Sequence, residues 1–181
     1  MFYTVECTYT DPRSEEDWNE FYSQEKLPAL VSVSGFSTSQ RFRALKPGCP
    51  VYLAIHTVKD ADVITSDEYR LKGGGNFSRW QRHVTDWHRN LYECDSTAPA
   101  VSSSEVLLLS SQPLSIIETA LGYRALEMRA SGLDKFPERR VAYVLAREHA
   151  AQLADVPGAY LYEPLTSQLQ SPAHGHLGEK Q

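Results

Sequence analysis

A histidine and a tyrosine in the segment 51–58 are the residues whose types and spacing best suit chemistry. The imidazole of His56 has an ordinary pKa near 6.5, which suits proton transfer at neutral pH. Tyr52 lies on the same strand face, about 13 Å away, so the two could flank a ring-sized ligand. The alternative is a structural histidine that bonds a neighbouring carbonyl in a half-buried sheet.

Glu6 is the second candidate, in the middle of the alternating segment 2–10 and between Thr4 and Thr8. On a strand adjacent to that of His56, its carboxylate could orient the imidazole and raise its pKa. Glu6 could instead pair with Arg41 or Arg43 on a neighbouring strand. We therefore predict His56 as the acid or base, with Glu6 or Tyr52 assisting.

Aromatic and basic side chains could hold a substrate near these groups. We predict a binding role for six of them: Tyr22, Lys26, Arg41, Trp80, Trp87 and His88. Trp and His can stack on a planar ligand, but the helical spacing of Trp80 and His83 is also typical of core packing. His83 and His88 are five residues apart, which disfavours a two-histidine metal site, so no metal is predicted.

Composition excludes several classes of function. The net charge of -5 argues against a nucleic-acid partner, and the apolar runs fall far short of the roughly 20 residues of a membrane helix. The 3 cysteines have no CxxC spacing, so no disulfide framework or zinc site is indicated. We expect a soluble, cytoplasmic protein that binds a small molecule and no membrane.

Strands and helices that would position these residues are expected in the first half of the chain, in a recognisable order. Alternating residues predict strands at 2–10, 37–44, 51–58 and 87–94. A helix with Trp18, Phe21 and Tyr22 on one face precedes a break at Pro28, and a shorter helix is expected at 62–71. The order β-α-β-β-α-β is that of a ferredoxin-like unit.

The second half repeats this order in shorter form. Strands are expected at 105–110, 123–130, 140–147 and 158–165, with helical turns at 113–121 and 148–155. The sequence Asn-Leu-Tyr-Glu at 90–93 is echoed by Tyr-Leu-Tyr-Glu at 160–163, which supports a duplication. The predicted organisation is one unit at 1–95, a linker at 96–104, an abridged unit at 105–170 and a disordered tail at 171–181.

One block near the start carries a family resemblance. It reads Trp18-Asn-Glu-Phe21-Tyr22-Ser-Gln-Glu25-Lys26-Leu-Pro28, then Ser34-Gly35-Phe36 and Arg41-Phe42. This block resembles the dimeric α/β-barrel superfamily, and within it the EthD-like small proteins. The match covers about thirty residues, and Lys26 stands where relatives often carry a histidine, so no role of that histidine is transferred.

The resemblance implies an α+β protein whose two ferredoxin-like units form or join a barrel, as a homodimer. It also implies a pocket between each sheet and its helices, used in relatives for cofactor-independent work on small aromatic molecules. His56 should then point into the barrel lumen, if Val51, Leu53 and Ile55 pack on the helices. We expect a cofactor-free isomerase, lyase, decarboxylase or cyclase for an aromatic or carbonyl-bearing molecule. A non-catalytic ligand-binding or haem-binding barrel and a monooxygenase-like barrel are the alternatives.

Overall fold

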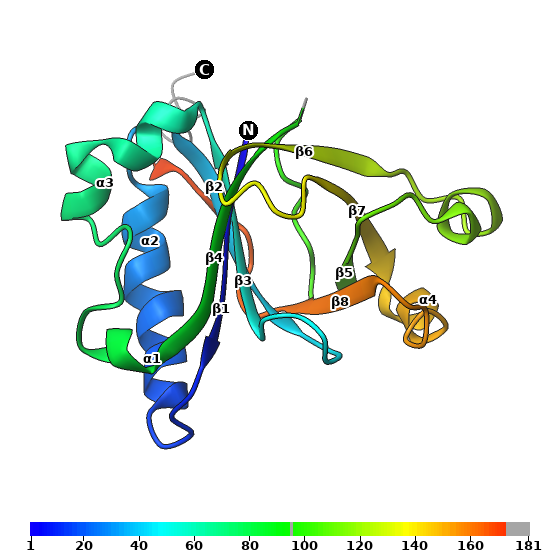
Figure 1. Ribbon diagram of the computed structural model, residues 1–181, viewed down its shortest axis with the longest axis horizontal. Helices are drawn as coiled ribbons and strands as arrows, with labels where there is room; N and C mark the ends of the chain where they lie inside the picture. Colours follow the sequence, from blue (N-terminus) through cyan, green and yellow to red (C-terminus); the bar gives the residue numbers. More distant parts are fainter. Residues whose placement is uncertain (95, 173–181) are drawn as a thin grey trace.

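A computed structural model describes residues 1–94 and 96–172, and it shows an α+β protein built on an antiparallel barrel (Figure 1). Most of the predicted tail, 173–181, lies outside the described residues. The barrel strands are β1 (Phe2–Tyr9), β2 (Phe36–Ala44), β3 (Tyr52–Val58), β4 (Val84–Glu93), β5 (Glu105–Ser110), β6 (Leu126–Leu133), β7 (Arg139–Ala146) and β8 (Ala159–Pro164). The α+β class and the barrel are thus confirmed.

The eight strands close into a ring within one chain. Their order is β3-β1-β4-β6-β7-β5-β8-β2, and pairing of β2 with β3 completes the circle. Two seams join the halves of the chain: β4 pairs with β6, and β8 pairs with β2. A short strand, β9 (Leu169–Gln170), adds to β2 beyond the second seam. A closed ring has no edge strands, so few backbone N–H and C=O groups of the strands are left unpaired.

One long helix covers the outer face of the first-half strands (Figure 1). It consists of α1 (Glu15–Phe21), a π-helical segment η1 (Tyr22–Lys26) and α2 (Leu27–Val31). The break expected at Pro28 is this π turn, after which the proline sits in the first turn of α2, where its missing N–H is harmless. The other helical segments are short: η2 (Ala61–Thr65), α3 (Asp67–Leu71), η3 (Ser78–His83), η4 (Ile116–Ala120) and α4 (Arg147–Ala151).

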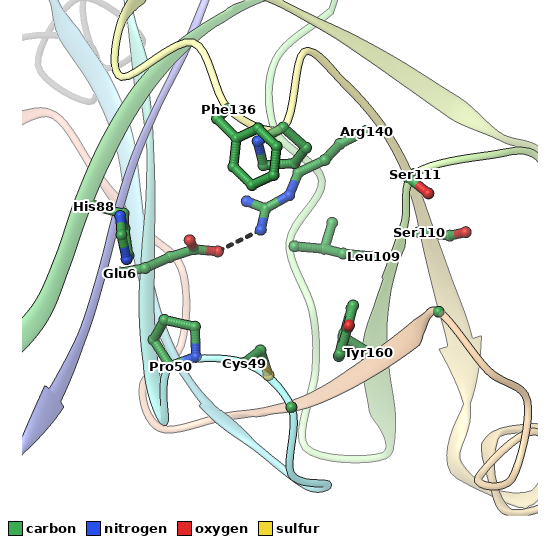
Figure 2. Close-up of a pocket in the computed structure, with 13 residues that line it drawn as sticks. Glu6, Cys49, Pro50, His88, Leu109, Ser110, Ser111, Phe136, Arg140 and Tyr160 are labelled. Carbon is green, nitrogen blue, oxygen red and sulfur yellow. Dashed lines mark hydrogen bonds and ion pairs between the residues drawn. The ribbon is translucent and has the colours of Figure 1, made fainter.

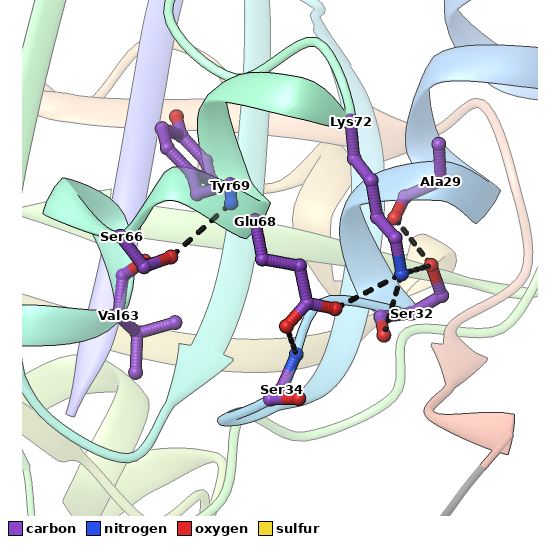
Figure 3. A network of polar contacts seen from close by, with 8 residues as sticks. All are labelled: Ala29, Ser32, Ser34, Val63, Ser66, Glu68, Tyr69 and Lys72. Carbon is purple, nitrogen blue, oxygen red and sulfur yellow. Dashed lines mark hydrogen bonds and ion pairs between the residues drawn. The ribbon is translucent and has the colours of Figure 1, made fainter.

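Helix α3 is fixed to the end of α2 by a polar network (Figure 3). Lys72 Nζ donates to Ser32 Oγ at 3.0 Å and to Glu68 Oε2 at 3.0 Å. The other oxygen of Glu68 accepts from the backbone N–H of Ser34 at 3.2 Å. No helix among the described residues is long and apolar enough to cross a lipid bilayer.

Three layers of buried side chains result. An aromatic layer lies between the helices and the first-half strands and includes Trp18, Tyr22 and Phe77. The barrel lumen is filled by side chains such as Phe2, Leu53, Ile55, Leu107 and Met128. A third layer covers the outer face of the second-half strands under η4 and α4.

The segment predicted as a linker, 96–104, runs across one end of the barrel. Ala98 and Val101 are buried. The Gln40 side chain donates to the carbonyl of Val101 at 2.8 Å and accepts from its N–H at 3.1 Å. Thr57 and Gln168 hold Ala98 in the same way, at 3.0 and 2.8 Å. Ala98 and Val101 of this segment thus pack against the side chains of the lumen.

Replacing Gln40 with leucine should destabilise the fold by about 2 kcal/mol, because both backbone groups of Val101 then lose a buried partner. Chemical denaturation monitored by circular dichroism measures this. Gln152→Leu, at an exposed position at the end of α4, is the matched control and should change stability little. Equal effects of the two substitutions would show that the Gln40 bonds do not hold the segment.

Candidate functional site

The sheet divides the predicted site residues into two groups on opposite faces. Both faces of β3 are buried, but Leu53 and Ile55 point into the lumen, whereas Tyr52 and Ala54 pack under the helices. His56 shares the face of Tyr52, and its ring lies against Tyr3 and Phe36 of the helix-side layer. The prediction that His56 faces the lumen is therefore wrong. The lumen also holds aromatic side chains, among them Phe2, Tyr92 and Tyr162, so it is not filled by aliphatic residues alone.

The predicted pairing of Glu6 with His56 is also wrong. Strands β1 and β3 are adjacent, as expected, but Glu6 lies opposite Leu53 and His56 lies opposite Tyr3. Glu6 and Tyr3 are an odd number of residues apart, so they project from opposite faces of the sheet. Glu6 points into the lumen and cannot reach the imidazole.

His56 is completely buried beneath the helices. Its Nδ1 lies 2.6 Å from Ser39 Oγ, and its Nε2 has no hydrogen-bond partner among the described residues. Burial, with a smaller effect of the Lys26 charge, lowers the pKa of His56 to about 3. The imidazole is therefore neutral near pH 7. His56 is buried as the structural alternative expects, but its partner is a serine hydroxyl and not a backbone carbonyl.

Lys26 and Arg41 also lie on the helix side. Lys26 Nζ donates to the backbone carbonyls of Gly73 and Asn76, the latter at 2.5 Å, and burial lowers its pKa to about 8. The guanidinium of Arg41 donates to Ser23 Oγ at 2.8 Å and lies over the Tyr22 ring. These cations bind protein groups under the helix layer, away from the lumen.

The remaining helix-side candidates are packed in the same layer. Tyr52 donates to the carboxylate of Glu15 and accepts from Asn19 Nδ2 at 2.9 Å. Trp80 stacks on Phe21, and Trp87 meets Phe77 edge to face. Core packing explains these positions.

His88 is the predicted binding residue that the structure places beside Glu6. The two are register partners on β4 and β1, so both project toward the lumen. They line a pocket of about 340 Å³ at the open mouth of the barrel (Figure 2). The volume lies within the range of small-molecule sites. Its other lining residues include Cys49, Pro50, Leu109, Phe136, Arg140 and Tyr160.

The inner end of this mouth pocket holds an ion pair between Glu6 of β1 and Arg140 of β7. Arg140 Nη2 donates to Glu6 Oε1 at 2.6 Å, and both side chains are nearly buried. Burial alone would lower the pKa of Arg140, but the charge of Glu6, followed by Tyr92, raises it, so the guanidinium stays charged. Glu6 therefore pairs with neither Arg41 nor Arg43.

Most of the rest of the pocket wall is apolar, and its other polar side chains are those of His88, Ser110 and Ser111. Pro50, Leu109, Phe136 and Tyr160 present carbon surface around the ion pair (Figure 2). None of the hydrogen bonds found among the described residues uses the second carboxylate oxygen of Glu6. An apolar pocket with a few converging polar groups is the usual form of a small-molecule site. Within the described residues, no three His, Cys, Asp or Glu side chains gather closely enough to hold a metal ion.

Sequence reasoning missed Arg140, Phe136 and Tyr160. Arg140 is 134 residues from its partner Glu6, and no local pattern marks two strands that face each other across a lumen. The alternation of Thr4, Glu6 and Thr8 was a usable signal, because it indicated a polar strand face. Identifying Arg140 as the partner of Glu6 required knowledge of the strand order in the barrel.

Comparisons with known proteins show a likeness in structure. No family model matches the sequence, and no curated protein matches it. The solved structure of an anthrone oxidase-like protein superposes with a TM-score of 0.59 at 9% identity, covering 94% of this chain and 93% of that one. The shared property is the fold.

Two proteins named "putative monooxygenase" show the same likeness. The protein from Lactobacillus acidophilus has a TM-score of 0.55 at 8% identity, with 94% of this chain and 96% of that one covered. The protein from Fusobacterium nucleatum has a TM-score of 0.56 at 9% identity, with 94% of each chain covered. All three superpose over nearly the whole chain, so the complete two-part barrel is shared.

The buried His56 predicts a specific dependence of stability on pH. An unfolded chain takes up a proton near pH 6.5, but the folded imidazole does so only near 3, so stability is lost as pH falls through this window. Relative to His56→Asn, the wild type should lose about 1.4 kcal/mol more per pH unit between pH 6 and 4. Urea denaturation at each pH measures this.

Ser39→Ala is the control for that measurement, because it removes the hydroxyl but keeps the imidazole. It should lower stability at every pH and preserve the wild-type slope. Identical slopes for the wild type and His56→Asn would contradict a neutral, buried His56.

Proposed function

We propose that this chain is a cofactor-free enzyme that moves a proton on a small carbonyl-bearing molecule bound in the mouth pocket. The observation that supports this most directly is the carboxylate of Glu6, paired with Arg140 at the inner end of an open, apolar-walled pocket. A base and a cation side by side are the two groups that such a reaction needs.

In the proposed reaction Glu6 is the base. A C–H bond next to the carbonyl breaks, its proton goes to the unpaired oxygen of Glu6, and the electron pair moves onto the carbonyl oxygen as an enolate. Arg140, beside Glu6, would offset the negative charge of that oxygen. Where a C=C bond is conjugated with the enolate, its charge extends to the γ carbon, and return of the proton there shifts the double bond and completes an isomerisation. His88, which also lines the pocket, would exchange protons with solvent.

Oxidation is the second candidate, and the names of the similar structures favour it. An enolate is electron-rich and can be oxidised by O₂ itself. In that case a methylene group becomes a carbonyl, one atom of O₂ is retained and the other leaves as water. The first step at Glu6 is the same for both candidates.

We also propose that each half of the barrel is a ferredoxin-like unit, the second one abridged. The first half has the order β1, α1–α2, β2, β3, α3, β4, and the second has β5, η4, β6, β7, α4, β8. One chain would then supply both sheets that the dimeric superfamily takes from two chains. A homodimer stays a prediction, because the barrel is already closed without a second copy.

Hydrogen–deuterium exchange tests the proton transfer without knowledge of the natural substrate. Wild-type protein in D₂O should speed the loss of α-proton NMR signals from small aryl ketones, and Glu6→Gln should slow this by about 100-fold or more. Glu127→Gln is the matched control, because Glu127 pairs with Arg139 on the exposed surface.

Other outcomes separate the alternatives. Ketone binding without exchange would favour the non-catalytic binding module, and unchanged exchange in folded Glu6→Gln would remove Glu6 as the base. Oxygen uptake in an electrode cell, stoichiometric with ketone and lost in Glu6→Gln, would assign the oxidation.

A further inference from the structure

One amino group of Arg140, at the inner end of the mouth pocket, has no acceptor. Nη2 donates to Glu6 (Figure 2), but Nη1 is buried and has no hydrogen-bond partner among the described residues. The side chain of Arg140 is only 10% exposed, so solvent does not take the place of the missing acceptor. A buried charged donor without an acceptor is costly for the fold.

The hydroxyl of Tyr162 is a second donor without an acceptor. The side chain is fully buried, and its hydroxyl has no hydrogen-bond partner among the described residues. Three other tyrosines are less than 2% exposed, and the hydroxyl of each has a partner: Tyr3, Tyr92 and Tyr143. A phenylalanine at position 162 would fill the same space without an unpaired hydroxyl. Packing therefore does not explain this tyrosine.

Tyr162 lies on β8, one step deeper in the barrel than the pocket wall. Tyr160, two residues earlier on the same strand face, lines the pocket and pairs with the wall residue Leu109. Tyr162 pairs with Leu107, which belongs to the lumen. Cys49 lines the pocket and packs against the lumen layer that contains Tyr162. The hydroxyl therefore lies behind this part of the pocket wall.

The two donors lie near each other, and both keep their protons. Burial, followed by the charge of Glu6, raises the pKa of Tyr162 well above its usual range. The charges of Arg140 and Tyr162 each affect the pKa of the other, which places them close together. An oxygen atom that carries negative charge is the acceptor that such donors bind most strongly.

We infer that Nη1 of Arg140 and the hydroxyl of Tyr162 form an oxyanion site for the enolate oxygen that Glu6 generates. The inference rests on the proposed function of the mouth pocket. As the C–H bond breaks and its electron pair moves onto the substrate oxygen, both donors bond to that oxygen and neither transfers a proton. The oxygen reaches Tyr162 past the small side chain of Cys49. Donors that bond to charge developing in the transition state raise kcat and change substrate binding little.

Tyr162→Phe tests this role, because it removes the hydroxyl and keeps the ring. It should lower the kcat of acetophenone α-proton exchange in D₂O about 100-fold and change KM little. The melting temperature should stay the same or rise, because an unpaired buried hydroxyl is lost. A purely structural role would not lower kcat in a variant that is equally stable. An unchanged kcat would overturn the inference.

Thr4→Val is the matched control. The hydroxyl of Thr4 is also buried without a partner among the described residues, but Thr4 does not line the mouth pocket. This variant should keep kcat and KM, again with an unchanged or higher melting temperature. An equal loss of kcat in Thr4→Val and Tyr162→Phe would show that any change in the lumen slows exchange, and it would remove Tyr162 from the site.

Binding of acetate tests the site without turnover. In Glu6→Gln the amide stands for the protonated Glu6 that accompanies the enolate, and a carboxylate oxygen of acetate stands for the enolate oxygen. Adding Tyr162→Phe to Glu6→Gln should weaken acetate binding about 10-fold in calorimetry, as expected when a hydrogen bond to a charged group is lost. Adding Thr4→Val should not weaken it. Equal acetate affinity with and without the Tyr162 hydroxyl would contradict the oxyanion site.

The outcomes also separate the oxyanion site from the proposed function. Acetate binding that depends on Tyr162, without ketone exchange by the wild type, would keep the anion site and remove the proton transfer. Exchange that is lost in Glu6→Gln but unchanged in Tyr162→Phe would keep Glu6 as the base and remove Tyr162. The kinetic comparison of Tyr162→Phe with Thr4→Val leaves Glu6 in place, so it decides the question if Glu6→Gln does not fold.

Discussion

The buried ion pair between Glu6 and Arg140 joins the two halves of the chain across the barrel interior. Strands β1 and β7 are separated by β4 and β6 in the ring, so the bond spans the lumen. Removing two charges from water is expensive, and only close geometry offsets it, while removing one partner leaves a buried charge unpaired. The pair thus ties the relative placement of the halves to the geometry of the pocket.

The polar side chains of the first-half strands lie in two buried layers, one under the helices and one in the lumen. Under the helices, Tyr3, Tyr52 and His56 find hydroxyl or amide partners, and the rings stack on one another. The lumen holds aliphatic side chains, aromatic ones such as Phe2 and Tyr92, and polar ones such as Gln40, which bonds the backbone of Val101. Glu6 is tolerated there because Arg140 reaches it from the far wall. The ion pair lies at the inner end of the mouth pocket.

Much of the fold was predictable from local patterns. The alternation in β1 and β3, the aromatic face of α1 and the strand order of the first half were all indicated by the sequence. The sequence did not indicate which face of β3 points into the lumen. Both faces are buried, so hydropathy cannot distinguish the lumen face from the face under the helices. Of the predicted site residues, Glu6 and His88 lie at the mouth pocket. Arg140 could not be found, since its place in the site comes from its contact with Glu6, which is far away along the chain.

A crystal structure with bound acetophenone tests the account most directly, because it places the ligand without reference to turnover. The account predicts the carbonyl oxygen within hydrogen-bonding distance of Arg140, with the α carbon next to Glu6. A ligand bound between the helices and the sheet, beside His56 and Arg41, would contradict it and return the site to the position implied by the dimeric α/β-barrel resemblance.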